Sequence, residues 1–196
     1  MRIISGTVRG RRLFTPGRSI GTSAIRPTSD RVREAVYNIL ADSVADAVTL
    51  DLFAGTGALG LEALSRGGSR AVFVDTSSDA IRLVKKNLDI CGFSNRATVL
   101  RRDLLKGPSF LRKIMPVAGF DLIFVDPPYR RGISVKILRY LGKFDLLSKD
   151  GLLVAEEASD IELPDEINGL QMSDRRVYGD TAICFYRNNV DEKQHE

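Results

Sequence analysis

The chain of 196 residues has no tryptophan, a single histidine and two cysteines. His195 lies in a polar C-terminal stretch, so neither a histidine-based catalytic triad nor a histidine zinc site is expected. Cys91 and Cys184 lie far apart and lack the spacing of metal ligands. We therefore expect two buried thiols in a reducing compartment, not a disulfide, and we predict no metal.

Long apolar runs are also missing. None approaches the ~20 residues of a membrane-spanning helix. Arginines at positions 2, 9, 11 and 12 interrupt the N-terminus where a signal peptide would need an apolar stretch. The 43% hydrophobic and 28% charged residues are typical of a globular protein with one α/β domain. We expect a cytoplasmic protein with no membrane partner, and a monomer, because no additional apolar patch is evident.

Acidic residues are nearly absent from the first 33 positions. This stretch holds eight arginines, no lysine and only one acid, Asp30, for a net charge of +7, whereas the other 163 residues carry −3. The guanidinium group can bind phosphate through two parallel hydrogen bonds. The asymmetry therefore indicates a nucleic-acid-facing segment on a nearly neutral body. The alternative is an ordinary solvated basic face.

The N-terminal third contains a predicted hairpin, a loop and a helix. Residues 2–5 and 11–15 read as two short strands around a glycine-containing turn, and residues 16–24 as a loop. Thr28 or Ser29 can cap a helix that Pro27 begins. The helix would bury one stripe of side chains: Val32, Ala35, Val36, Ile39 and Leu40.

From residue 48 onwards, strand and helix patterns alternate. Strands are predicted at 48–53, 70–75, 97–101, 120–126 and 151–157, and helices at 58–66, 78–91, 107–115 and 132–142. The strands are nearly continuous apolar runs, which is typical of a parallel sheet covered on both faces. Residues 170–177 and 182–187 read as an antiparallel hairpin.

The predicted fold class is therefore α/β. We expect a Rossmann-like, doubly wound, mostly parallel seven-stranded sheet with an antiparallel last strand, plus a small basic N-terminal β-hairpin. The corresponding division of the chain is a basic N-terminal extension at 1–24, a main domain at 25–187 and a polar tail at 188–196.

A glycine turn follows the first predicted strand of this domain. Gly55-Thr56-Gly57-Ala58-Leu59-Gly60 matches G-x-G-x-x-G, and Asp75 lies 20 residues past Gly55, as in dinucleotide-binding proteins. Asp51, however, lies four residues before Gly55. Its carboxylate would repel a pyrophosphate but can bind an ammonium group, directly or through water. A nucleoside that carries an amino acid fits better than NAD, which remains an alternative.

Further acids follow the next strands. Asp75 could accept both ribose hydroxyls, and Asp103, after the third strand, could accept the adenine amino group. Either acid by itself is equally well explained as a solubilising charge at a strand end. Together, at the ends of successive parallel strands, they favour a ligand crevice.

These residues resemble the motifs of class I S-adenosylmethionine-dependent methyltransferases. Asp51 to Gly57 resembles their first motif, and the closing hairpin resembles their reversed last strand. The resemblance implies S-adenosylmethionine as cofactor and implies its binding residues: Asp51, Phe53, Ala54, Gly55, Thr56, Gly57, Asp75, Thr76, Asp103 and Leu104.

The most specific motif is Asp126-Pro127-Pro128-Tyr129, after the strand at 120–126. Two prolines fix the backbone and remove two N–H donors, so the carbonyls and Asp126 can accept from both hydrogens of a planar NH2 group. Tyr129 can stack on the base that carries this group. The alternative is a Pro-Pro turn that only ends a strand. The motif resembles that of methyltransferases acting on adenine N6, guanine N2 or glutamine amides, and it assigns a catalytic role to all four residues.

The N-terminal third resembles the RsmD family, bacterial enzymes that methylate guanine N2 in small-subunit ribosomal RNA. The resemblance rests on residues 2–6, 9–13 and 26–40; Ser5 and the Asp75-Thr76 pair depart from it in a minor way. It implies a partner, 16S rRNA within the 30S subunit or its assembly intermediate. The implied RNA contacts are Arg9, Arg11, Arg12, Arg26 and Arg31.

Two other functions remain open at this point. One is a DNA adenine N6-methyltransferase, which the same chemistry permits, although no separate DNA-recognition domain fits in the remaining residues. The other is a non-catalytic RNA-binding or ribosome-assembly module that keeps the cofactor fold.

Overall fold

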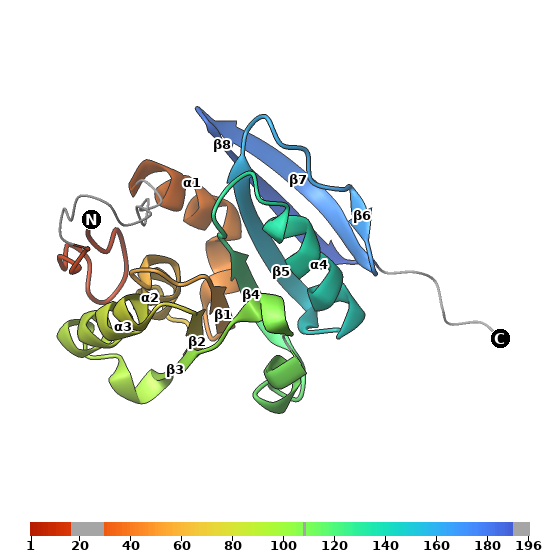
Figure 1. The fold of residues 1–196 in the computed structure, drawn as a ribbon. Helices are drawn as coiled ribbons and strands as arrows, with labels where there is room; N and C mark the ends of the chain where they lie inside the picture. The colour runs from red at the N-terminus through yellow and green to blue at the C-terminus, as the bar shows by residue number, and fades with distance from the viewer. Residues whose placement is uncertain (17–29, 108, 190–196) are drawn as a thin grey trace.

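A computed structural model describes residues 1–16, 30–107 and 109–189. Its centre is one eight-stranded sheet in the order β3-β2-β1-β4-β5-β8-β7-β6 (Figure 1). The strands are β1 Val48–Leu52, β2 Arg70–Asp75, β3 Ala97–Arg101, β4 Phe120–Val125, β5 Leu147–Ala158, β6 Glu166–Ile167, β7 Leu170–Tyr178 and β8 Thr181–Asn188. The α-helices are α1 Asp30–Leu40, α2 Ala58–Ser65, α3 Ser78–Cys91 and α4 Ile133–Lys143. The short 3-10 helices are η1 Ala41–Val44, η2 Ser94–Arg96, η3 Leu104–Lys106 and η4 Ser109–Lys113.

The mixed sheet confirms the Rossmann-like prediction. Strands β1 to β5 pair in parallel, and β8 runs antiparallel between β5 and β7. Because strand side chains alternate between the two faces, both faces of each central strand carry apolar groups. Leu50 and Leu52 of β1 share a cluster with α4, whereas Phe73 of β2 packs with α2 and α3, and Phe124 of β4 packs with α1.

Two details of the prediction are wrong. The sheet has eight strands instead of seven, because the two-residue β6 pairs with β7. The helix predicted at 107–115 is replaced by the short η4. Gly107 has a φ of +125°, outside the helical region, and Pro116 follows soon after, so the segment is too short for a regular α-helix. The predicted cap at Thr28 or Ser29 lies outside the described residues.

The predicted N-terminal hairpin is also wrong. Residues 1–16, here called the N-terminal segment, contain one isolated bridge between Arg2 and Arg12 and no strand. The reason is that its backbone N–H groups bond to α2 instead of to each other. Ile4 and Ser5 donate to the Glu62 carboxylate at 2.8 and 2.9 Å. The separate division of the chain at residue 24 remains a prediction.

Close packing accompanies these hydrogen bonds. The N–H of Thr7 donates to the Ser65 carbonyl at 2.7 Å, and the Ser65 hydroxyl donates to the Ser5 carbonyl at 2.6 Å. A Cβ atom at Gly6 would lie 1.9 Å from the Ser65 carbonyl oxygen, so only glycine permits this approach. Figure 1 shows the N-terminal segment in red beside α2 and α3. The segment is therefore part of the folded body.

A buried ionic cluster holds the same region together. Glu62 of α2 is fully buried and pairs with Arg66 at 2.9 Å and with the fully buried Arg33 of α1 at 3.6 Å. The Arg33 guanidinium also donates to the carbonyl of Arg2 and pairs with Asp30. One carboxylate thus links α1, α2 and the N-terminal segment, and its removal would leave a buried cation with one partner fewer.

We expect the substitution Glu62→Ala to lower the free energy of unfolding by about 3–5 kcal/mol, because it breaks a buried ion pair from one side. Urea denaturation followed by circular dichroism would measure this loss. Asp79→Ala is the matched control: it removes an acid from a pair with Arg82 that is about three-quarters exposed, and should cost less than about 1 kcal/mol. Equal losses for both variants would contradict the role given to Glu62.

Candidate active site

Four acids lie at one edge of the sheet because the parallel register places the strand ends there. In this register, Asp51 of β1 pairs with Phe73 of β2 and Phe124 of β4. The chain leaves β1, β2, β3 and β4 beside Asp51, Asp75, Asp103 and Asp126 respectively. Strand order reverses between β1 and β4, and such switch points are where open α/β sheets bind ligands.

The glycine turn after β1 has a constrained backbone. Phe53, Gly55 and Gly57 have φ values of +62°, +54° and +78°, a region that side chains with a Cβ rarely adopt. The N–H of Ala54 donates to Val74 of β2 at 3.1 Å, and Gly57 is the N-cap of α2. The turn is thereby fixed between two strands and a helix, and its backbone can closely approach a ligand.

Asp51 lies behind this turn with only 2% of its surface exposed. Its Oδ2 accepts a hydrogen bond from the N–H of Gly60 at 2.9 Å. Burial raises the pKa of the Asp51 carboxyl to about 7, with a further contribution from Asp75, while the Gly60 hydrogen bond opposes the shift. The carboxyl is therefore close to half ionised at neutral pH, so a nearby cation would favour its charged form.

Asp75 is oriented by backbone donors. Its Oδ2 accepts from the N–H of Gly55 at 3.0 Å and its Oδ1 from the N–H of Ser77 at 2.8 Å. The carboxylate therefore connects the end of β2 directly to the glycine turn. Each carboxylate oxygen can accept a second hydrogen bond, so both remain able to bind ligand hydroxyls. The adjoining Thr76 is exposed.

Asp103 follows β3 and caps η3. Its Oδ1 accepts from the N–H of Leu105 at 2.9 Å, and its side chain is 37% exposed. The Leu104 side chain is buried in the core with α4, so only its backbone can meet a ligand. Asp51, Asp75 and Asp103 form a set of acceptors, which fits an ammonium group, hydroxyls and an amino group but repels a pyrophosphate. The residues present therefore fit S-adenosylmethionine.

The acidic-proline corner leaves β4 at the switch point. The N–H of Asp126 lies 3.5 Å from the carbonyl oxygen of Leu52, directly before the glycine turn. Pro127 is buried, Asp126 and Tyr129 are half-buried, and Pro128 is exposed. The structure thus brings the two motifs singled out in the sequence next to each other.

The Tyr129 side chain is hydrogen-bonded at its hydroxyl. The hydroxyl donates to Oε1 of Glu156 on β5 and lies 3.2 Å from the Thr181 hydroxyl on β8. Burial first, and then the Glu156 carboxylate, raise the pKa of the Tyr129 phenol. The phenol therefore keeps its proton at neutral pH.

Glu156 and Glu157 were not predicted from the sequence. Glu157 is 1% exposed and accepts from the N–H of Arg130 at 3.0 Å and from the Ser134 hydroxyl at 2.7 Å. It thereby connects the end of the corner to α4. A signal was available, because two adjacent carboxylates in a strand buried on both faces need hydrogen-bonding partners.

Asn87 of α3 was also missed. Its amide donates to the carbonyls of Thr56 at 2.9 Å and Phe14 at 3.0 Å, and its oxygen accepts from the N–H of Phe14 at 2.7 Å. The side chain therefore joins the glycine turn to the N-terminal segment. Its position on the buried stripe of α3, three residues after Val84, was the available signal.

The predicted RNA contacts are surface residues where the structure describes them. Arg9, Arg11 and Arg12 are exposed on the N-terminal segment, and Arg31 is exposed at the start of α1. Arg26 lies outside the described residues. Lys86 of α3 adds a cation 3.5 Å from the Phe14 ring centre, so the positive charge extends from the N-terminal segment onto α3.

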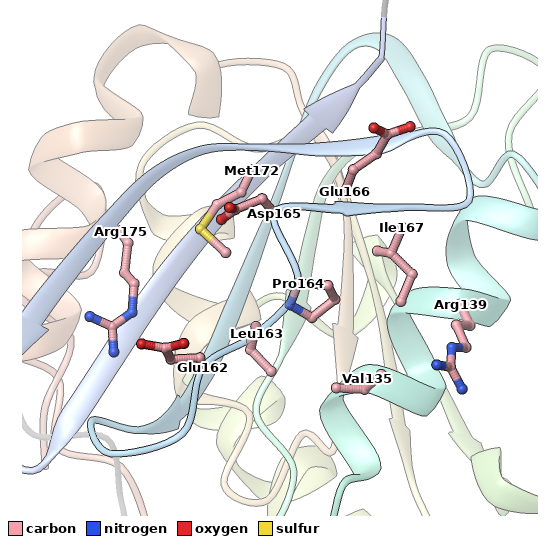
Figure 2. Close-up of a pocket in the computed structure, with 10 residues that line it drawn as sticks. All are labelled: Val135, Arg139, Glu162, Leu163, Pro164, Asp165, Glu166, Ile167, Met172 and Arg175. Atoms are coloured by element: carbon pink, nitrogen blue, oxygen red, sulfur yellow. The ribbon is translucent and has the colours of Figure 1, made fainter.

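A groove of about 680 Å³ lies elsewhere, between α4 and the β6–β7 hairpin (Figure 2). It is lined by Val135, Arg139, Glu162, Leu163, Pro164, Asp165, Glu166, Ile167, Met172 and Arg175. None of the residues predicted to bind cofactor or base lines this groove, so it is distinct from the site at the strand ends. In the part of the chain that the structure describes, no three potential ligand side chains group as a metal site, and no helix has the length and apolar character to cross a bilayer.

Comparison with known proteins agrees with this geometry. The family model described as Conserved hypothetical protein 95 matches residues 1–187. YlbH of Bacillus subtilis (strain 168), itself only a candidate rRNA methyltransferase, is 36% identical over 95% of this chain and 98% of its own. Ribosomal RNA small subunit methyltransferase D of Escherichia coli (strain K12) is 36% identical over 95% of this chain and 89% of its own.

The solved structure of yhhF, a candidate methyltransferase from Escherichia coli, superposes with a TM-score of 0.80. It is 34% identical, and the match covers 96% of this chain and 97% of that chain. Fold, site and sequence therefore agree over nearly the whole length, and the chain belongs to the RsmD family of S-adenosylmethionine-dependent methyltransferases.

Proposed function

We propose that the chain transfers a methyl group from S-adenosylmethionine to the exocyclic N2 amino group of a guanine in 16S rRNA. The observation that carries the proposal is the position of the Asp126–Tyr129 corner at the sheet's switch point, adjoining the end of the strand that leads into the glycine turn. The substrate is the 30S subunit or its assembly intermediate, and the protein acts in the cytoplasm as a monomer.

The residues at the ends of β1, β2 and β3 would hold the cofactor. Asp51 favours its ammonium group, Asp75 accepts from its ribose hydroxyls, and Asp103 accepts from its adenine amino group. The glycine turn, with Phe53 to Gly57, gives the ligand a fixed backbone surface. When bound, S-adenosylmethionine supplies an electrophilic methyl group.

The acidic-proline corner would hold the guanine. The Asp126 carboxylate and the Pro127 carbonyl accept hydrogen bonds from the NH2 group, which points the nitrogen lone pair toward the cofactor side. The same acceptors stabilise the positive charge that develops on the nitrogen during transfer. Tyr129 stacks on the base and fixes its plane. These residues act mainly through orientation and electrostatics.

The RNA partner is supported by charge and by the relatives. The exposed Arg9, Arg11 and Arg12 lie on a segment that Asn87 connects to the glycine turn, so phosphate contacts there would lie on the cofactor side of the fold. The Escherichia coli relative is named for the small ribosomal subunit. A base must leave its stack to reach the corner, as in other enzymes that modify nucleobases.

The deciding experiment is transfer of labelled methyl from S-adenosylmethionine to 30S subunits isolated from cells without this protein, followed by nucleoside analysis. The expected product is N2-methylguanosine. N6-methyladenosine, or transfer to DNA but not to 30S subunits, would overturn the base or substrate assignment. Confirmed RNA binding without any methyl transfer would favour the assembly-module function instead.

We expect Asp126→Ala to reduce methyl transfer by at least about 100-fold, because one acceptor for the amine and its developing charge is lost. Titration calorimetry with S-adenosylhomocysteine should show unchanged cofactor affinity. Asp150→Ala, at an exposed acid in the first half of β5, is the matched control and should leave both quantities unchanged. Loss of cofactor binding in the Asp126 variant would contradict the assigned role.

We expect cofactor affinity to rise with pH between 6 and 8. With a pKa of about 7, Asp51 is about one-tenth ionised at pH 6 and about nine-tenths at pH 8, and only the carboxylate attracts the ammonium group. Calorimetry across this range should show tighter binding at pH 8 for the native protein. Asp51→Asn should bind more weakly at pH 8 and lose this dependence. An equal dependence in the variant would place the titrating group elsewhere.

A further inference from the structure

The aromatic ring of Tyr129 is held at both ends. At one end its backbone continues the proline corner, and at the other its hydroxyl donates to Glu156 and lies 3.2 Å from the Thr181 hydroxyl. Glu156 and Thr181 come from neighbouring antiparallel strands, since Thr181 pairs with Ala158 in the β5–β8 register. Both partners of the hydroxyl therefore belong to the rigid sheet.

Burial makes the contact with Glu156 strong. Glu156 is only 8% exposed, and hydrogen bonds to a carboxylate in such surroundings are about twice as strong as those between neutral groups. The raised pKa of the Tyr129 phenol keeps the proton on the hydroxyl, so the hydroxyl remains the donor. The ring thus has one fixed polar partner across the whole working range of pH.

The backbone beyond the ring is fixed by the next residue of β5. Glu157 accepts from the N–H of Arg130 at 3.0 Å, from the N–H of Ala158 at 2.9 Å and from the Ser134 hydroxyl. Arg130 has a φ of +59°, an uncommon conformation for a residue with a side chain. Adjacent strand residues point to opposite faces, so this pair of glutamates reaches two different parts of the corner.

We propose that Glu156, supported by Thr181, is a positioning residue that sets the plane of the Tyr129 ring for stacking on the target base. The inference rests on the proposed function, in which Tyr129 stacks on the base. Glu156 touches neither base nor cofactor in this scheme. It acts through the tyrosine hydroxyl, and misplacement of a stacked base by about 1 Å can reduce a rate by about 100-fold.

A double-mutant cycle tests the inference. Tyr129→Phe keeps the ring but removes the hydroxyl, and Glu156→Met removes the acceptor but keeps the approximate length of the side chain. Each should lower the methyl-transfer rate at saturating cofactor about tenfold, with unchanged affinity for S-adenosylhomocysteine. Tyr129→Phe/Glu156→Met should be within about twofold of either single variant, because both changes remove the same interaction.

Two further variants separate positioning from general stability. Glu156→Gln keeps an oxygen acceptor and should retain at least about one-third of the native rate. Tyr186→Phe is the matched control, because Tyr186 is a buried tyrosine whose hydroxyl donates to the Pro164 carbonyl at 2.8 Å, away from the corner. It should leave the transfer rate unchanged. A roughly hundredfold, multiplicative loss in the Tyr129→Phe/Glu156→Met variant would overturn the inference, as would a native rate for Glu156→Met.

A measurement without turnover keeps the inference separate from the proposed function. NMR of ring-labelled tyrosine reports the exchange of the two edges of the Tyr129 ring. We expect slow exchange in the native protein and in Glu156→Gln, and faster exchange in Glu156→Met. If the native protein transfers no methyl group to RNA or DNA, the proposed function fails, and unchanged ring exchange in Glu156→Met would overturn the inference independently.

Discussion

The parallel pairing of β1 with β2 on one side and β4 on the other is the constraint on which the site depends. This register, with Leu50 opposite both Val72 and Ile123, places the chain ends after three strands at one edge. The glycine turn and the proline corner are more than 70 residues apart in sequence, yet one pairing brings them together. Neither motif could act if either strand shifted by one residue, because every side chain would then change face.

A second dependence is the buried charge of Glu62. The N-terminal segment carries the exposed arginines, but it also covers Ile3 and supplies two N–H donors to this carboxylate. Removing the segment would leave Glu62 and Arg33 buried with fewer partners. The segment is therefore a structural part of the fold as well as the candidate RNA surface, which explains why its backbone bonds to α2 rather than forming a hairpin.

The sequence predicted the sheet and both motifs because their signals are local. Apolar runs such as residues 122–125, and the glycines at 55 and 57, carry the same meaning in any α/β protein. The hairpin failed because the competing partner, Glu62, is 58 residues from Ile4 in the chain. The groups that hold the corner, Glu156 and Thr181, were missed for the same reason, since only the fold shows that they face Tyr129.

Asn87 gives the molecule a thermodynamic link between its two ligand surfaces. One amide group bonds to the Thr56 carbonyl of the glycine turn and to both backbone groups of Phe14. A nucleic acid that displaces Phe14 must alter the donor that the turn shares, and a cofactor that tightens the turn must favour the present position of Phe14. Such an influence is necessarily reciprocal, so any cooperativity between the two ligands has the same magnitude whichever binds first.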